Sequence, residues 1–331
     1  MPAQHASETG NLSLRAAPRF NVRQFVNVVP PSIVVLVALL LFCLFFRPVL
    51  LQWPFQMVIA RQAAPLGLAV AAQMIVMRCR SIDLSIGGVF VLTNYLITSA
   101  PLNELSAPML IAGALAVGAL VGLMNGLLIT QFRASAVIAT LAMASILTGT
   151  VLFLSSGSSP GSVPDSVQML GSAKIGIVPI ATVLWVVVLV LLAIPLRLMV
   201  FGRLLKAVGS NPAAAALSGL PVEGVFIASH VAAGLLAAGG GLLLSGYVGV
   251  STTSVGADVV MNSIAGVILG GITFGGGRGG LIGPGAAAFA LTLLFNVLNA
   301  YGAGESGKLI VQGLAIAGAA ILAGVARQTR R

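Results

Sequence analysis

The chain has 331 residues, of which 58% are hydrophobic and only 7% are charged, and its mean hydropathy is +1.08. This composition excludes a soluble globule of this size, because there is too little polar surface to cover one, and it predicts an integral membrane protein. The net charge of +10 does not indicate a nucleic-acid-binding protein, because the basic residues are scattered singly between apolar runs instead of being gathered on one solvated face.

The N-terminal residues 1–24 are polar and contain three arginines. They lack the apolar core and the small-residue cleavage site of a signal peptide, so they are predicted to form a cytoplasmic tail. Residues 25–326 are predicted to form one transmembrane permease domain, and residues 327–331 a second cytoplasmic tail.

Apolar runs follow one another along the rest of the chain, and each is about as long as a helix that crosses the hydrocarbon core. They predict an all-α membrane protein with about ten spans. Eight spans would remain if the second and third runs were re-entrant. The predicted spans are residues 25–46, 61–77, 84–101, 107–130, 135–155, 176–197, 221–246, 258–275, 280–301 and 308–326.

The distribution of Lys and Arg predicts the orientation of these spans. If the N-terminus is cytoplasmic, 13 of the 17 basic residues lie on the cytoplasmic side, and only Arg47, Arg61, Lys174 and Lys308 lie outside. Both termini are then cytoplasmic, which requires an even number of spans.

Glycines recur at helical spacing in two of the predicted spans. Gly118, Gly122 and Gly126 lie four residues apart, and Gly266 and Gly270 repeat this spacing. Such a stripe lets neighbouring backbones approach closely in a bilayer, where helices gain little from hydrophobic association. We therefore expect these glycines to serve helix packing.

The sequence shows no pattern typical of a catalytic or cofactor site. It has no G-x-x-x-x-G-K-[ST] loop, and the G-x-G-x-x-G spacing within 275–280 lies between membrane helices rather than between a strand and a helix. His230 is alone in an apolar span and is expected to be packed and hydrogen-bonded. Cys43 and Cys79 lack metal-ligand spacing. The chain is therefore expected to be non-catalytic and to bind no cofactor or metal.

The segment 201–224, between the sixth and seventh spans, contains the signals of a short helix in a cytoplasmic loop. Ser210 or Asn211 can cap its first turn, Pro212 suits the first helical position, and Gly219 ends it. A helix this short needs packing to be stable. It is either a connector that rests on lipid headgroups or a helix that docks into a cytoplasmic partner.

Five segments, in this order and spacing, resemble those of a known family: "RQAAPLGLAV" leading to "SIDLSIGG", "ASAVIATLAMASILTGTVLFLSSG", "GRLLKAVGSNPAAAALSG" and "NSIAGVILGGITFGGGRGGLIGPGAAAFALTLLFNVLN". The chain resembles the membrane subunit of bacterial ABC importers for simple sugars such as ribose, arabinose and galactose. The resemblance covers about residues 55 to 325.

This resemblance implies a pore-forming permease of the bacterial inner membrane that works by alternating access as a pair of identical or paralogous copies. Separate ATPase subunits would bind ATP and Mg, and a periplasmic solute-binding protein would deliver the substrate. The short loop helix would then contact the ATPase. The residues that carry this coupling are Asn211, Pro212, Ala213, Ala214, Leu217, Ser218 and Gly219.

The chain departs from the family pattern at two places. Family members commonly have "TGGIDLS" where this chain has Cys79, Arg80 and Ser81 before the "IDLS" motif, so two glycines are replaced by larger residues. In the loop helix, Ala213 and Ala216 stand where the family has Glu and Arg. The loss of these charges is expected to weaken polar contacts with an ATPase.

Asp83, Ser85 and Gly87 belong to the family motif, and two roles are open for the acid. Its carboxylate can cap the backbone N–H groups of Ser85 and Ile86 at the cytoplasmic start of the third span, with Arg80 as an ionic partner. It can also take part in gating or in contact with a partner. A third hypothesis makes the chain an ion-coupled secondary transporter that uses Asp83, because buried carboxylates in membranes are costly and usually functional.

The sequence indicates the residues that line the substrate path less clearly than it indicates the family. Trp53 and Trp185 lie near span ends, where aromatic residues usually serve as interfacial anchors. Polar side chains inside the spans can line the path or form interhelical hydrogen bonds. These candidates are Gln73, Asn94, Asn125, Asn262, Asn296 and Asn299.

Overall fold

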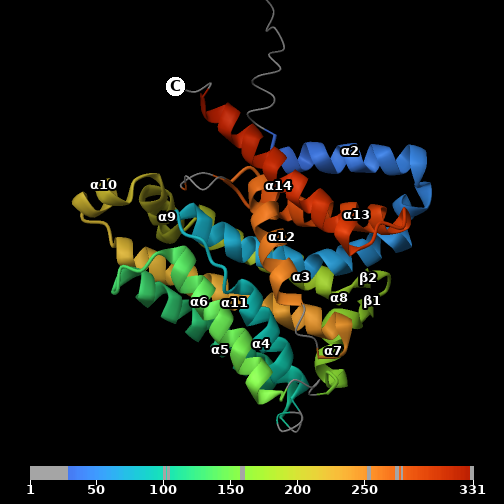
Figure 1. The fold of residues 1–331 in the computed structure, drawn as a ribbon, viewed down its shortest axis with the longest axis horizontal. Coiled ribbons are helices and arrows are strands. Elements are labelled where there is room, and N and C mark those ends of the chain that lie inside the picture. Colours follow the sequence, from blue (N-terminus) through green and yellow to red (C-terminus); the bar gives the residue numbers. More distant parts are fainter. Residues whose placement is uncertain are drawn as a thin grey trace, which may run out of the picture.

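The computed structural model describes residues 29–99, 102, 105–156, 161–251, 255–272, 276 and 279–328, and their regular structure is helical apart from one short hairpin (Figure 1). The elements in chain order are α2 (Pro31–Phe46), the 3-10 turn η1 (Pro48–Leu51), α3 (Trp53–Arg78), α4 (Ile86–Thr98), α5 (Ala107–Thr130), α6 (Ala136–Leu154), α7 (Asp165–Ser172), β1 (Lys174–Ile175), β2 (Val178–Pro179), α8 (Ile180–Arg197), α9 (Val200–Ser210), α10 (Pro212–Leu217), α11 (Val222–Val248), α12 (Val255–Leu269), α13 (Ile282–Ala300) and α14 (Glu305–Gln328).

Six of the described helices are long and apolar enough to cross a membrane, namely α3, α5, α6, α8, α11 and α13. Each of the ten predicted ranges contains a helix, but α2, α4 and the apolar part of α12 are shorter. The predominantly helical class is therefore confirmed, and the short hairpin is an addition that the sequence did not predict. The count of ten spans and the orientation of the termini stay predictions.

Several of the predicted boundaries differ from the observed helix ends, and two of these differences have a clear physical cause. The second helix begins at Trp53 rather than at residue 61, because Arg61 and Gln62 find polar partners inside the bundle and do not end the helix. The sixth span begins at Ile180 rather than at residue 176, because β1 and β2 pair in an antiparallel hairpin whose turn places Gly176 at a φ of +62°.

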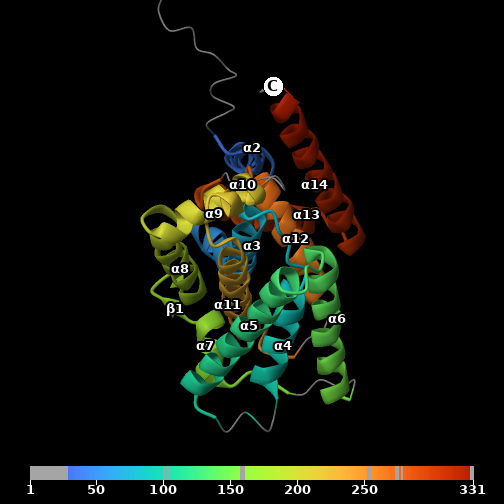
Figure 2. The same ribbon diagram turned by 90° about the vertical axis from the view of Figure 1, so that its left-hand side faces the viewer.

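The interior of the bundle is formed by α3 and α11. In α3 the most apolar stretch is 78% buried, whereas in α8 the corresponding stretch is only 17% buried. Helix α11 packs against α3, α4, α5 and α7. The mostly exposed helices α5, α6 and α8 therefore form the outside of the bundle, where their apolar side chains suit contact with lipid (Figure 2).

Helices α5 and α11 cross backbone to backbone at the predicted glycine stripe. A Cβ on Gly122 would lie 2.1 Å from the carbonyl oxygen of His230, and a Cβ on Gly234 would lie 2.0 Å from that of Gly118. Real side chains do not approach a backbone so closely, so this contact requires glycine. The packing role expected for the stripe is thus confirmed at Gly118 and Gly122.

The two ends of the bundle carry different short elements. Helices α9 and α10 lie at one end, and α7 with the hairpin lies towards the other, as both ribbon views show (Figures 1 and 2). Helix α3 contains Pro65 in its interior. Because proline has no N–H group, Pro65 cannot donate to the carbonyl of Arg61, so one rung of the helix is missing there.

The glycine contact gives a stability prediction. Gly122→Ala should lower the free energy of unfolding by about 1–3 kcal/mol, because the methyl group forces α5 and α11 apart. Gly113→Ala is the matched control on the same helix, since nothing lies within 4 Å of its added Cβ. Thermal unfolding of both variants in detergent measures the difference. Equal stability of the two variants would contradict the close crossing.

Candidate functional site

A polar cavity of about 310 Å³ lies between α3, α11, α12 and α13. Amide, hydroxyl and carboxylate side chains from three of these helices line it together with one aromatic ring. A cavity of this size is at the lower end of the range for small-molecule sites. The lining residues are Gln62, Pro65, Leu66, Leu244, Asp258, Val259, Asn262, Thr292, Phe295, Asn296 and Asn299.

Hydrogen bonds fix the amides on one side of this cavity. Asn296 Nδ2 donates to Gln62 Oε1 at 2.8 Å and to the Thr292 carbonyl at 2.9 Å. Gln62 Nε2 donates in turn to the Tyr247 hydroxyl at 3.0 Å. Both amide hydrogens of Asn296 are therefore engaged, and its Oδ1 remains as an acceptor.

Further acceptors come from α12. Asp258 and Asn262 are four residues apart and share one face of this helix. Asn262 Oδ1 is buried and has no hydrogen-bond partner among the described residues. A buried acceptor without a partner is costly, so the cavity is suited to a ligand that donates hydrogen bonds.

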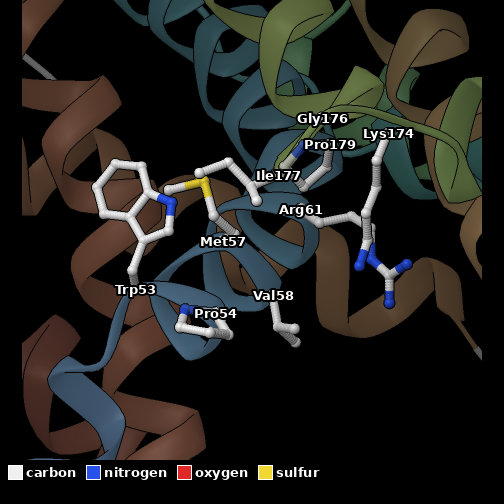
Figure 3. A pocket seen from close by; sticks show the side chains of 9 residues that line it. All are labelled: Trp53, Pro54, Met57, Val58, Arg61, Lys174, Gly176, Ile177 and Pro179. Atoms are coloured by element: carbon white, nitrogen blue, oxygen red, sulfur yellow. The ribbon is translucent and has the colours of Figure 1, made fainter.

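A second pocket of about 200 Å³ adjoins this network near the N-terminus of α3. Arg61 and Lys174 lie on one side of it and Trp53 on the other (Figure 3). The guanidinium of Arg61 lies 4.8 Å from the centre of the Tyr247 ring, a favourable cation–π distance. Tyr247 therefore contacts residues of both pockets.

The six residues predicted to line a path separate into two groups. Asn262, Asn296 and Asn299 line the polar cavity together. The other three are buried elsewhere: Asn94 donates to Ser245 Oγ and the Val250 carbonyl, Asn125 donates to Ser85 Oγ, and the amide of Gln73 has no partner among the described residues. Only the first group is placed to meet a solute in this cavity.

Sequence reasoning missed the other polar and aromatic lining residues, which are Gln62, Asp258, Thr292 and Phe295. Gln62 was detectable as a polar residue inside a predicted span, and Asp258 as an acid one helical turn before Asn262. Phe295 had no sequence signal beyond its position next to Asn296.

The two tryptophans differ in their surroundings. Trp53 is 55% exposed, whereas Trp185 is 6% exposed and packs against Gly67. The interfacial role expected for Trp185 is therefore wrong.

Asp83 lies just before α4 and is 1% exposed. Its Oδ1 accepts from the Ser85 backbone N–H at 2.8 Å and from Ser85 Oγ at 2.6 Å, and Ser85 Oγ accepts in turn from Asn125 Nδ2 at 2.8 Å. The carboxylate therefore stabilises the turn that starts α4 and links it to α5. Beside it, a Cβ on Gly87 would lie 2.2 Å from the Gly256 carbonyl oxygen, so α4 contacts α12 closely.

Each residue of the divergent Cys79-Arg80-Ser81 segment makes a defined contact. Ser81 Oγ lies 3.1 Å from Nε2 of His230, whose Nδ1 lies 2.9 Å from the Phe226 carbonyl. Because a carbonyl only accepts, Nδ1 carries the proton, and Nε2 of a neutral ring accepts from Ser81. Burial raises the pKa of the Cys79 thiol to about 12, so it is inert at neutral pH.

Arg80 does not form the expected ion pair with Asp83. Its Nε donates to the Gly209 carbonyl at 2.8 Å, and a terminal guanidinium nitrogen donates to the Ser210 carbonyl. Arg80 also has a φ of +64°, a left-handed conformation that costs a residue other than glycine about 1 kcal/mol. It therefore occupies a glycine conformation and uses its side chain to bind the end of α9.

The loop predicted to hold one short helix contains two. Helix α9 leads into α10, and Asn211 Oδ1 caps α10 by accepting from the Ala214 N–H at 3.1 Å. Gly219 follows α10 with a φ of +75°. Only Ala215 of α10 is buried, whereas Leu217 is 92% exposed. The helix thus presents an apolar face outward.

Residues 57–320 match the family model described as "Branched-chain amino acid transport system / permease component". The chain belongs to this permease family. A ribose import permease, RbsC, from Escherichia coli K12 is 30% identical to it over 78% of this chain and 82% of its own length. An autoinducer 2 import permease, LsrC, from Enterobacter sp. strain 638 is 33% identical over 82% of this chain and 79% of its own.

A probable ABC transporter permease, y4mJ, from Sinorhizobium fredii is 32% identical over 78% of both chains. No solved structure matches the chain. These relatives confirm the family expected from the sequence, and with the six apolar helices they show a multi-pass membrane protein. The family description and the relatives name different solutes, so family membership alone does not identify the substrate of this permease.

The Asp83 geometry predicts different effects for two substitutions. Asp83→Asn retains an oxygen that accepts from Ser85, so stability and transport should change little. Asp83→Ala leaves the Ser85 N–H and hydroxyl without this acceptor and should cost about 1–3 kcal/mol. Thermal unfolding and solute uptake measure both. Loss of uptake in a stable, inserted Asp83→Asn protein would show that the charge itself acts in gating or ion coupling.

Proposed function

We propose that the chain is the permease subunit of an ABC importer that carries a simple sugar or a related small polar solute across the bacterial inner membrane by alternating access. The polar cavity is the observation that carries this proposal. Its acceptors, Asp258 and the side-chain oxygens of Asn262 and Asn296, match a solute with many hydroxyl donors. Phe295 offers an apolar ring surface to the C–H face of such a solute.

Helix α10 is the proposed contact for the ATPase. Six residues cannot form a stable helix alone in water, so packing must support α10. Exposed Leu217 and the alanines around it suit an apolar groove on a partner. Alanine at positions 213 and 216 makes this contact less polar than the family pattern implies. ATP and Mg would be bound, and ATP hydrolysed, on the partner chain.

The opposite end of the bundle is the proposed contact for the periplasmic solute-binding protein. Arg61 and Lys174 are two of the four cations predicted on the outer side, and they line the same pocket. Together they would attract an acidic surface and steer its approach. A second copy of the permease, or a paralogue, would complete the path, as the family resemblance implies.

An ion-coupled secondary transporter is the less favoured alternative. Asp83 already accepts two hydrogen bonds from Ser85, and these bonds stabilise the turn at the start of α4. The named relatives are permeases, and one of them is described as an ABC permease. We therefore assign energy coupling to ATP hydrolysis on a partner.

Replacement of residues 211–219 by a Gly/Ser linker tests the coupling role of α10. The variant should lose co-purification with the partner ATPase and lose ATP-dependent uptake, because the apolar contact at Leu217 is removed. The control is the same replacement at residues 174–179, in the hairpin at the opposite end, which should leave ATPase binding intact. Unchanged co-purification of the first variant would instead make α10 a connector on lipid headgroups.

Two asparagines test the substrate path. Asn262→Ala should reduce uptake about tenfold with little change in stability, because its Oδ1 has no hydrogen-bond partner to lose among the described residues. Asn94→Ala should show the reverse, lower stability with substrate affinity retained, because Asn94 bonds to Ser245 and Val250. Uptake into proteoliposomes and thermal unfolding separate the two effects. Normal uptake by Asn262→Ala would remove Asn262 from the path.

A further inference from the structure

Arg80 joins two parts of the molecule that the proposed function needs to move together. It follows α3 directly, and its guanidinium binds the carbonyls of Gly209 and Ser210, the last two residues of α9. The next residue, Asn211, caps α10. The arginine therefore links the end of α3 to the junction from which the coupling helix begins.

The chemistry of this link is favourable. The last carbonyls of a helix lack intrahelical partners and carry partial negative charge, so a cation that donates to them is stabilised. The fork of Arg80 donates to two successive carbonyls, which restricts the junction more than one bond would. Gly276 lies directly against this contact. A Cβ there would lie 2.7 Å from Arg80 Cγ and 2.5 Å from the Gly209 carbonyl oxygen.

The backbone conformation shows that the position itself favours glycine. Ser81 N–H donates to the Val76 carbonyl at 3.0 Å and Arg80 N–H to the Met77 carbonyl at 3.1 Å, the bonding pattern of a Schellman motif. Helices α10 and α13 end in the same pattern, with Gly219 and Gly302 at the equivalent position. In α3 this chain carries an arginine there in spite of the strain.

Helix α3 extends from this link to the polar cavity. Gln62, Pro65 and Leu66 line the cavity, and Arg78 lies 16 residues after Gln62, which is about 24 Å along the helix. By contrast, α10 buries only Ala215 against the bundle. The bonds of Arg80 are thus a direct route from the coupling helix to a wall of the cavity.

We propose that Arg80 is a positioning residue that transmits the movement of α10 to α3, and so to the cavity. This inference rests on the proposed function of α10. Ala213 and Ala216 remove charges from the surface of the coupling helix, and Arg80 supplies a charged contact behind it.

The test uses the assembled transporter with its ATPase and binding protein in proteoliposomes. Arg80→Gly relieves the backbone strain but also removes the stabilising bonds to α9, so the two effects oppose each other and the unfolding temperature should change little. ATPase co-purification and basal ATP hydrolysis should be unchanged. The number of solute molecules transported per ATP hydrolysed should fall at least about fivefold, because two charge-assisted bonds are lost.

Two further variants keep the test specific. Arg80→Asn tolerates the left-handed backbone but cannot reach α9, so it should repeat the loss of coupling. Arg133→Gly is the matched control, since Arg133 also has a positive φ, of 53°, but does not share the bonds of Arg80 to the end of α9 within the described part of the chain. Its coupling ratio should equal that of the unmodified chain.

The failure of this inference differs from the failure of the proposed function. A coupling ratio in Arg80→Gly equal to that of the unmodified chain would overturn the role of Arg80 while leaving α10 as the ATPase contact. An equal fall in Arg133→Gly would also overturn it, by assigning the effect to charge alone. If the unmodified chain binds no ATPase, the proposed function itself is wrong.

Discussion

The architecture depends on how closely helix backbones approach one another around α3 and α11. A bilayer offers helices little hydrophobic reason to associate, so contact between backbones has to supply the packing energy. At Gly122 and Gly234 the carbonyl of the facing helix occupies the space of a Cβ, and at Gly67 the ring of Trp185 does so. With α3 and α11 held in this way, the polar cavity has walls that are fixed on two sides.

Polar groups are few in this apolar bundle, and they occur in two kinds of setting. Groups with complete hydrogen bonding, such as Asp83 with Ser85 and His230 with Ser81, connect helices near the α9–α10 end. Asn262 lines the polar cavity instead, and its buried Oδ1 has no hydrogen-bond partner among the described residues. Satisfied groups such as Asp83 and His230 stabilise the bundle, whereas the polar groups that line the cavity are placed to meet a solute.

Much of the fold could be predicted from the sequence because apolar length and glycine spacing are local signals. The range 107–130 was predicted to the residue, and Asn211 and Gly219 bound the short helix as expected. The start of α3 could not be predicted, because the partner that accommodates Arg61 is Tyr247, which is 186 residues away. The grouping of Asn262 with Asn296, and their separation from Gln73, depend on the same long-range packing. So does the binding of Arg80 to Gly209, whose partner no spacing rule identifies.

Pro65 gives α3 an uneven stiffness along its length. The missing hydrogen bond to the Arg61 carbonyl lies at the turn that lines the polar cavity, whereas the half of α3 nearer Arg80 has a complete ladder and is buried on all sides. A helix that is displaced at one end bends most easily where a backbone hydrogen bond is missing. Displacement of the Arg80 end of α3 would therefore bend the helix near Pro65, beside the solute. The cavity wall would change its angle instead of shifting along the helix axis.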